Sequence, residues 1–136
     1  MPKLPEDLPT AFAHRIAARD NPPPPPPLSP EPVAVAARVD AWLRSTYHLR
    51  DARSVLRMGR MLRALMQYPE RTTGELAEAA GLPAQAAARV AVRLGGLGLT
   101  TWESRGLYRY WRLARATEDA LLGVVVGPPT PLGAVQ

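Results

Sequence analysis

Residues 72–113 read TTGELAEAAGLPAQAAARVAVRLGGLGLTTWESRGLYRYWRL, and their first ten positions carry the signals of a short helix. Thr72 and Glu75 are spaced as in a capping box, in which each side chain bonds to the backbone of the other. Gly81 suits the left-handed position just beyond a helix C-terminus. These signals predict a helix that begins at Thr72 or Thr73 and ends at Gly81.

A second helix and a hairpin are predicted after this turn. Leu82-Pro83 opens a helix over residues 84–96, whose final glycines end it and free the chain to turn. Two runs rich in β-branched and aromatic residues, 99–103 and 107–113, are predicted to pair as strands around Ser104-Arg105-Gly106. The stretch therefore predicts the order helix, turn, helix, hairpin.

Two such short helices must bury one face of each against the preceding helix. The side chains predicted to be buried are Leu76, Ala77, Ala80, Ala87, Ala91 and Leu94. Gln85, Arg89 and Arg93 remain outward on the second helix, where their i, i+4, i+8 spacing places them on one face. Glutamine can pair with adenine and arginine with guanine, so this face presents three groups able to contact bases.

The predicted hairpin adds basic side chains to those of the second helix. Arg105 lies at its tip, and Arg109 and Arg112 lie on its second strand. Residues 84–115 contain six arginines against a single acid, which favours contact with phosphates. The neighbouring aromatics can stack on unpaired bases, although packing the hairpin on the helices is their commoner use. These aromatics are Tyr108, Tyr110 and Trp111.

Helices are also predicted on both sides of this stretch. Residues 51–67 have apolar side chains at helical spacing, and Pro69 ends that helix. Its opposite face forms a second candidate basic patch, either a solvated surface or an extended phosphate track: Arg50, Arg53, Arg57 and Arg60. The helices predicted at 33–48 and 117–126 carry apolar stripes larger than a small core needs, which predicts a homodimer interface. Those stripes are Val35, Val39 and Trp42, and Leu121, Leu122 and Val125.

Residues 1–32 contain eleven of the sixteen prolines, which predicts a flexible, largely disordered arm ahead of a domain at 33–127. Residues 128–136 are predicted as a disordered tail. Within the arm, a short helix over 7–19 would place Leu8, Phe12 and Ile16 on one face. The arm is therefore either a disordered tail with a polyproline spacer or a docking segment for a protein partner.

The composition is that of a basic protein without cysteine. The net charge is +5 and the sixteen arginines far outnumber the one lysine, which favours nucleic acid as a partner. A GC-rich genome accounts for part of the preference for arginine, but not for where the arginines lie. The absence of cysteine excludes thiolate metal sites and disulfides, and the two histidines are far apart. No catalytic or phosphate-loop motif is present, so we expect no enzyme, metal or cofactor. Without an export signal or membrane segment we expect a cytoplasmic location.

Residues 58–113 resemble the winged helix-turn-helix domain of bacterial ArsR-type and MarR-type regulators. The pieces that carry the resemblance are Met58–Gln67, Glu75-Leu76-Ala77 with Gly81, Ala84–Gly96, Leu97-Gly98-Leu99 and Tyr110-Trp111-Arg112-Leu113. The resemblance implies a mainly helical fold with a β-hairpin wing, whose second helix enters the DNA major groove. Ala88 and Val90 stand where the family commonly carries polar residues, which favours backbone contacts over sequence-specific reading.

Together these observations predict a DNA-binding protein that acts as a small transcriptional regulator or phage-type accessory factor. Double-stranded DNA would be contacted by Gln85, Arg89, Arg93, Arg105, Arg109 and Arg112. The alternative is an adaptor that uses the same fold to dock on a larger machine, such as polymerase or a replication complex. A third hypothesis combines the two, with the domain on DNA and the arm recruiting a partner. Salt dependence separates the first two, since only DNA binding predicts a steep one.

Overall fold

The computed structural model describes residues 7–20 and 28–127, which form a mainly helical fold with a small antiparallel sheet. Along the chain the elements are α1 (Leu8–Asp20), α2 (Pro32–Tyr47), α3 (Ala52–Gln67), β1 (Arg71–Thr72), α4 (Thr73–Ala80), α5 (Ala84–Gly96), β2 (Thr100–Arg105), β3 (Tyr108–Leu113) and α6 (Arg115–Val126). The prediction of a helical fold with a hairpin is confirmed. The predicted polyproline spacer at 22–27 and tail at 128–136 lie outside the described residues.

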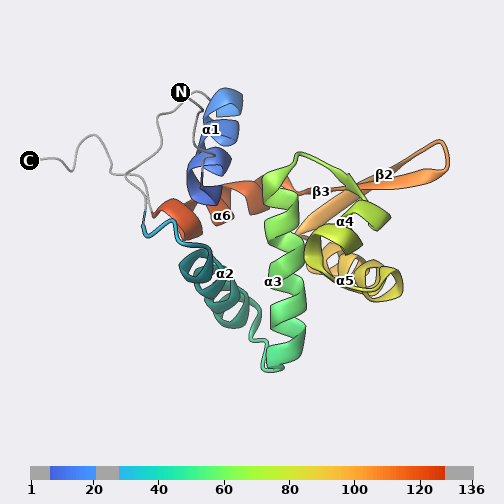
Figure 1. Ribbon diagram of the computed structural model, residues 1–136, viewed down its shortest axis with the longest axis horizontal. Helices are drawn as coiled ribbons and strands as arrows, with labels where there is room; N and C mark the ends of the chain where they lie inside the picture. Colours follow the sequence, from blue (N-terminus) through green and yellow to red (C-terminus); the bar gives the residue numbers. More distant parts are fainter. Residues whose placement is uncertain (1–6, 21–27, 128–136) are drawn as a thin grey trace, which may run out of the picture.

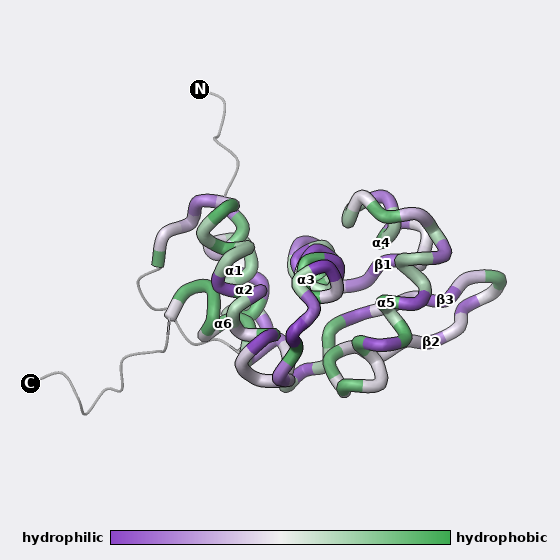
Figure 2. Tube along the Cα trace, turned by 90° about the horizontal axis from the view of Figure 1, so that it is seen from below, coloured by the Kyte–Doolittle hydropathy of each residue, from purple (hydrophilic) through white to green (hydrophobic). Residues whose placement is uncertain are grey.

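Helix α3 is the central element of the fold. Figure 1 shows α1, α2 and α6 on one side of it, and α4, α5 and the sheet on the other. The same division appears in the perpendicular view of Figure 2. Because α3 is packed from two sides, apolar residues on most of its surface are buried, including Met58, Met61, Leu62 and Met66. Its arginines take exposed or half-buried positions: Arg53, Arg57, Arg60 and Arg63.

The helix predicted over 7–19 forms as α1 and is part of this core, so these residues are not separate from the domain. The side chains of Phe12 and Ile16 are 1% and 2% exposed, and Leu8 packs against the same core. Arg15 and Arg19 donate hydrogen bonds of 2.7 and 2.6 Å to Glu118 of α6. The predicted docking face of α1 is thus buried within its own molecule.

The apolar stripes of α2 and α6 also face inward. Val35, Val39, Leu121 and Val125 are at most 1% exposed, and Trp42 and Leu122 pack partly buried against the core. Arg38 of α2 adds hydrogen bonds to the carbonyl oxygens of Val124 and Val125 at the end of α6. The stripes therefore do not indicate a dimer interface. A homodimer stays a prediction, now without this basis.

The predicted pair of short helices and the turn between them are confirmed in detail. The backbone N–H of Glu75 donates to Thr72 Oγ1 at 3.2 Å, and the N–H of Thr72 donates to Glu75 Oε1 at 2.8 Å. Gly81 has φ of 67° beyond the end of α4, the left-handed conformation that glycine adopts without strain. All six side chains predicted to be buried are at most 7% exposed: Leu76, Ala77, Ala80, Ala87, Ala91 and Leu94.

The hairpin forms with shifted ends and an additional partner strand. Arg105 pairs with Tyr108, so the turn is at Gly106-Leu107, where Gly106 has φ of 61°. The two residues of β1 pair with β3, giving the order β1-β3-β2. The buried Trp111 donates from Nε1 to Thr73 Oγ1 at 2.9 Å, which joins β3 to the start of α4. Helix α6 starts at Arg115, two residues before the predicted start at 117.

Candidate nucleic-acid interface

The outward face of α5 carries the three residues predicted to contact bases. Gln85, Arg89 and Arg93 are exposed, because Ala87, Ala91 and Leu94 on the other side of the helix are buried. No acidic residue occurs in α5. The face therefore combines a glutamine amide with two positive charges that no neighbour on the same helix neutralises.

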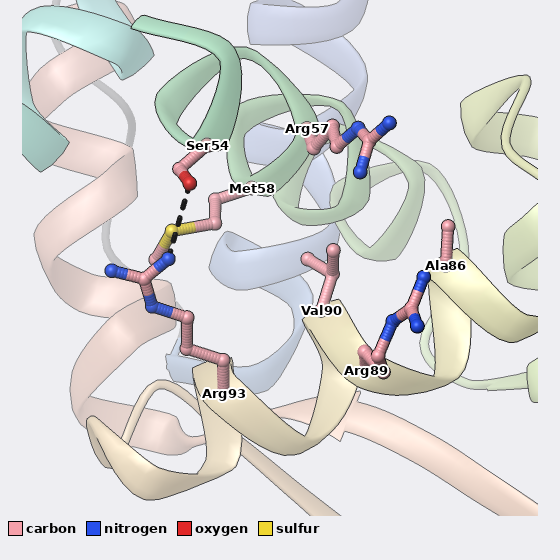
Figure 3. Close-up of a pocket in the computed structure, with 7 residues that line it drawn as sticks. All are labelled: Ser54, Arg57, Met58, Ala86, Arg89, Val90 and Arg93. Carbon is pink, nitrogen blue, oxygen red and sulfur yellow. Dashed lines mark hydrogen bonds between the residues drawn. The ribbon is translucent and has the colours of Figure 1, made fainter. Parts of the chain in front are cut away.

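A groove between α3 and α5 brings two separately predicted groups of arginines together. Ser54 and Arg57 of α3 and Arg89 and Arg93 of α5 line this groove, and Figure 3 shows the guanidinium of Arg93 on Ser54 and that of Arg57 pointing away from Arg93. The guanidinium of Arg93 donates to Ser54 Oγ at 3.2 Å. The groove has a volume of about 170 Å³, and its other lining residues are Met58, Ala86 and Val90. Arg57 of the second candidate patch is thus next to the predicted recognition face.

The other members of the second patch lie outside this groove. Arg50, Arg53 and Arg60 are exposed, and none of them lines it. Arg60 lies close enough to Asp40 and Arg63 to influence the pKa of both groups, on the side of α3 that faces α2. The patch predicted as one stripe is therefore divided, and of its four arginines only Arg57 lines the groove.

Two of the three hairpin arginines have acidic partners. Arg105 forms an ion pair with Glu70 and stacks over the ring of Tyr110, with 3.9 Å from its guanidinium carbon to the ring centroid. The hydrogen bond from Arg105 lowers the pKa of Glu70, which keeps that carboxylate charged. Arg112 lies 3.9 Å from Glu103. These interactions partly neutralise this face of the hairpin, which weakens the case for its two arginines as phosphate ligands.

Arg109 has a different environment on the opposite face of the hairpin. Its guanidinium carbon lies 3.8 Å from the ring centroid of Trp102 and 5.6 Å from that of Trp111. Arg109 also lines a second groove with Val92 and Trp102, between α5 and the hairpin. Strand alternation places Trp102, Arg109 and Trp111 on the face toward α5, away from Arg105 and Arg112. Arg109 is therefore the hairpin arginine that shares a side with the α5 face.

Three residues of this region were not predicted as functional from the sequence. Ser54 contacts Arg93 across 39 positions of the chain, and Glu70 contacts Arg105 across 35. No local pattern indicates such pairs. Trp102 had a usable signal, because in a hairpin with a turn at Gly106-Leu107 it lies opposite Trp111. The predicted loop at 104–106 gave a different strand register, which hid this pairing.

Metal-binding and membrane-spanning features are absent from the described part of the chain. Among residues 7–20 and 28–127 no group of three or more histidine, cysteine or acidic side chains is placed to hold a metal ion. Over the same two ranges no helix has the length and apolar character needed to cross a membrane.

Comparison with protein-family models, with curated proteins and with solved structures finds no match to this chain. The functional conclusion therefore depends on the geometry and charge of the grooves around α5.

Proposed function

We propose that this protein is a winged helix-turn-helix DNA-binding protein. In this proposal α5 enters the major groove and the β2–β3 hairpin lies on the adjoining backbone. The observation that carries it is the exposed, acid-free face of α5 formed by Gln85, Arg89 and Arg93, on the second of two short helices that a hairpin follows. These side chains are of the kinds that contact base edges and phosphates.

The distribution of charge supports the same proposal. Neither α3 nor α5 contains an acidic residue, and together they present Arg53, Arg57, Arg89 and Arg93. The acids nearest to α5 in the sequence are on other elements, Glu78 of α4 and Glu103 of β2, and those nearest to α3 are Asp51 and Glu70. Asp51 is used at the α3 N-terminus, where it accepts from the Arg53 N–H at 3.1 Å. In the proposed complex, DNA phosphates contact α3 and α5 as one positively charged surface. This contact releases the counterions bound to the phosphates, and that release favours binding.

The role that fits this proposal is a small cytoplasmic transcriptional regulator whose affinity comes mainly from the DNA backbone. The α5 face is short of polar side chains for base reading, since Ala88 and Val92 are the residues just before its two arginines. Phosphate contacts fix the position of a protein on DNA, whereas base contacts select the sequence. We therefore expect substantial binding to random duplex and a modest preference among sequences.

The experiment that tests the proposal is fluorescence anisotropy with a random-sequence duplex, from low to physiological salt. We expect wild-type affinity to fall steeply with salt. The Arg89→Ala/Arg93→Ala variant should bind more weakly and show a flatter salt dependence, by about 0.9 in log–log slope for each phosphate that the variant no longer neutralises. Arg44→Ala/Arg60→Ala is the matched control, because it removes the same charge from exposed positions outside α5. An equal weakening in both variants, or no binding at low salt, would reject the proposal.

A protein-docking adaptor is the second candidate function, and exposed apolar side chains favour it. Leu107 at the hairpin tip is 94% exposed, Tyr108 is 61% exposed and Val92 on α5 is 59% exposed. Leu107 and Tyr108 are adjacent on the hairpin, and exposed hydrophobic patches are typical of contact surfaces. Docking of this kind would show little salt dependence, so the same titration in the presence of a partner separates it from DNA binding.

A further inference from the structure

The groove between α5 and the β2–β3 hairpin has a tryptophan ring as part of its surface. Trp102 is 48% exposed, although tryptophan is on average a well-buried residue. It lines a groove of about 570 Å³ together with Arg109 and the buried Trp111. This volume is within the range of small-ligand sites, about 300–1,000 Å³. The groove is therefore large enough to hold a planar ring beside Trp102.

The α5 side of the groove carries little side-chain bulk. Helix α5 contributes Val92, Gly95 and Gly96 to the lining. A Cβ at Gly96 would meet no atom of another element within 4 Å, so the space at this end of α5 is open. Val92 is 59% exposed and directly precedes Arg93, so the groove adjoins the charged face of α5. A nucleic-acid strand on that face would pass next to the groove.

The ring of Trp102 is held in place by its neighbours on the hairpin. The guanidinium carbon of Arg109 lies 3.8 Å from the Trp102 ring centroid, and the ring centroid of Trp111 lies 6.2 Å from it. Trp111 is fixed in turn by its hydrogen bond to Thr73. A side chain that is ordered before binding loses little conformational freedom when a ligand contacts it. Trp102 is thus a preorganised stacking surface with a positive charge beside it.

The charge of the groove favours an anionic ligand. Arg109 lines it, and no carboxylate is among its lining residues. Glu103 of the same hairpin lies on the opposite face, 3.9 Å from Arg112. An aromatic ring beside an arginine is the combination on which single-stranded nucleic acids bind, with the base on the ring and the backbone near the positive charge.

We propose that this groove binds one unpaired nucleobase, which stacks on Trp102 while its phosphate contacts Arg109. A base inside an intact duplex is stacked between its neighbours, so only a base outside the stack offers a face to Trp102. The inference deepens the proposed function and rests on it, since α5 would hold the adjoining duplex. The preferred ligand is therefore a duplex that continues into a single strand, rather than a fully paired duplex.

A comparison that changes only the bases of the single strand tests this site. Fluorescence anisotropy measures binding to a duplex with a short thymine tail, and to the same duplex with an equally long tail of abasic residues. Both tails carry the same phosphates, so the ratio of the two affinities reports base contact alone. We expect the wild type to prefer the thymine tail by about 5- to 150-fold, the range for one stacked base. Equal affinity for the two tails would overturn the proposal.

Variants of the hairpin assign the preference to Trp102. Trp102→Leu should reduce the ratio toward one, whereas Trp102→Phe should keep part of it, because a phenylalanine ring can still stack on a base. Tyr108→Leu is the matched control, because Tyr108 is 61% exposed on the opposite face of the same hairpin. Circular dichroism checks that each variant is folded. An equal decrease of the ratio in Trp102→Leu and Tyr108→Leu would reject the groove as the base site.

Tryptophan fluorescence separates failure of this site from failure of the proposed function. A free thymine oligonucleotide is added to the wild type and to Trp102→Leu, with an abasic oligonucleotide of the same length as the reference. We expect the thymine oligonucleotide to quench the wild type, and this quenching to be lost in Trp102→Leu. Quenching without binding to any duplex would keep the base site and reject the proposal of duplex binding. Duplex binding with neither quenching nor a tail preference would reject the base site and keep the proposed function.

Discussion

The substitution Phe12→Ala tests whether α1 belongs to the folded core. The ring of Phe12 is 1% exposed, and α1 packs on both α3 and α6. The guanidinium carbon of Arg15 also lies 5.3 Å from the centroid of this ring. Alanine removes the ring from a site enclosed by other elements and leaves a cavity that only partial relaxation can fill.

The expected cost is large relative to the stability of a small domain. Truncating a buried phenylalanine to alanine costs about 3–5 kcal/mol, out of about 5–15 kcal/mol of total unfolding free energy. For a domain of this size, that destabilisation lowers the midpoint of thermal unfolding by on the order of 10–20 °C. A helix on an arm separate from the domain would instead melt independently and leave this midpoint unchanged.

Circular dichroism provides the assay, with thermal and urea unfolding of the full chain. Ala18→Gln is the control, because Ala18 lies on the exposed side of the same helix and should change the midpoint little. A Phe12→Ala midpoint within about 2 °C of wild type, with or without a decrease in helical signal, would refute the docking of α1 as part of one cooperative unit.

The remaining predictions concern the contact between α2 and α3. A Cβ at Gly59 would clash with Asp40 Oδ1, so Gly59→Ala should destabilise by about 1 kcal/mol, because the cost of overpacking exceeds the gain in helix propensity. In an Asp40→Ala background the same substitution should stabilise, and urea unfolding of the four variants checks this change of sign. Burial raises the pKa of Asp40, although the positive charge of Arg63 opposes this shift. The folded state therefore favours protonated Asp40. This contribution to stability is complete below the pKa of Asp40 in the unfolded chain, and it is lost as pH rises through the pKa of Asp40 in the folded protein. Asp40→Asn should therefore gain stability over wild type between pH 4 and pH 7, and an unchanged difference across that range would contradict it.

The sequence predicted the two short helices α4 and α5 and their turn closely because the signals are local. The capping box at Thr72, the left-handed Gly81 and the apolar spacing of both helices each involve residues a few positions apart. The same periodicity placed Gln85, Arg89 and Arg93 outward, and the structure places them there. The hairpin was predicted with its turn displaced, because the strand pattern left open which residues would pair across Gly106.

What the sequence determined by itself is therefore which segments form helices and strands, and which face of each is apolar. Only the tertiary structure decided what covers each apolar face: α1 packs on α3 and α6, and the stripes of α2 and α6 fill one core instead of a dimer interface. It also decided that Arg57 lines the same groove as Arg89 and Arg93, and that Arg105 pairs with Glu70. The physical reason is that periodicity fixes the direction of a side chain relative to its own helix or strand, whereas the partner on that side depends on how distant segments pack.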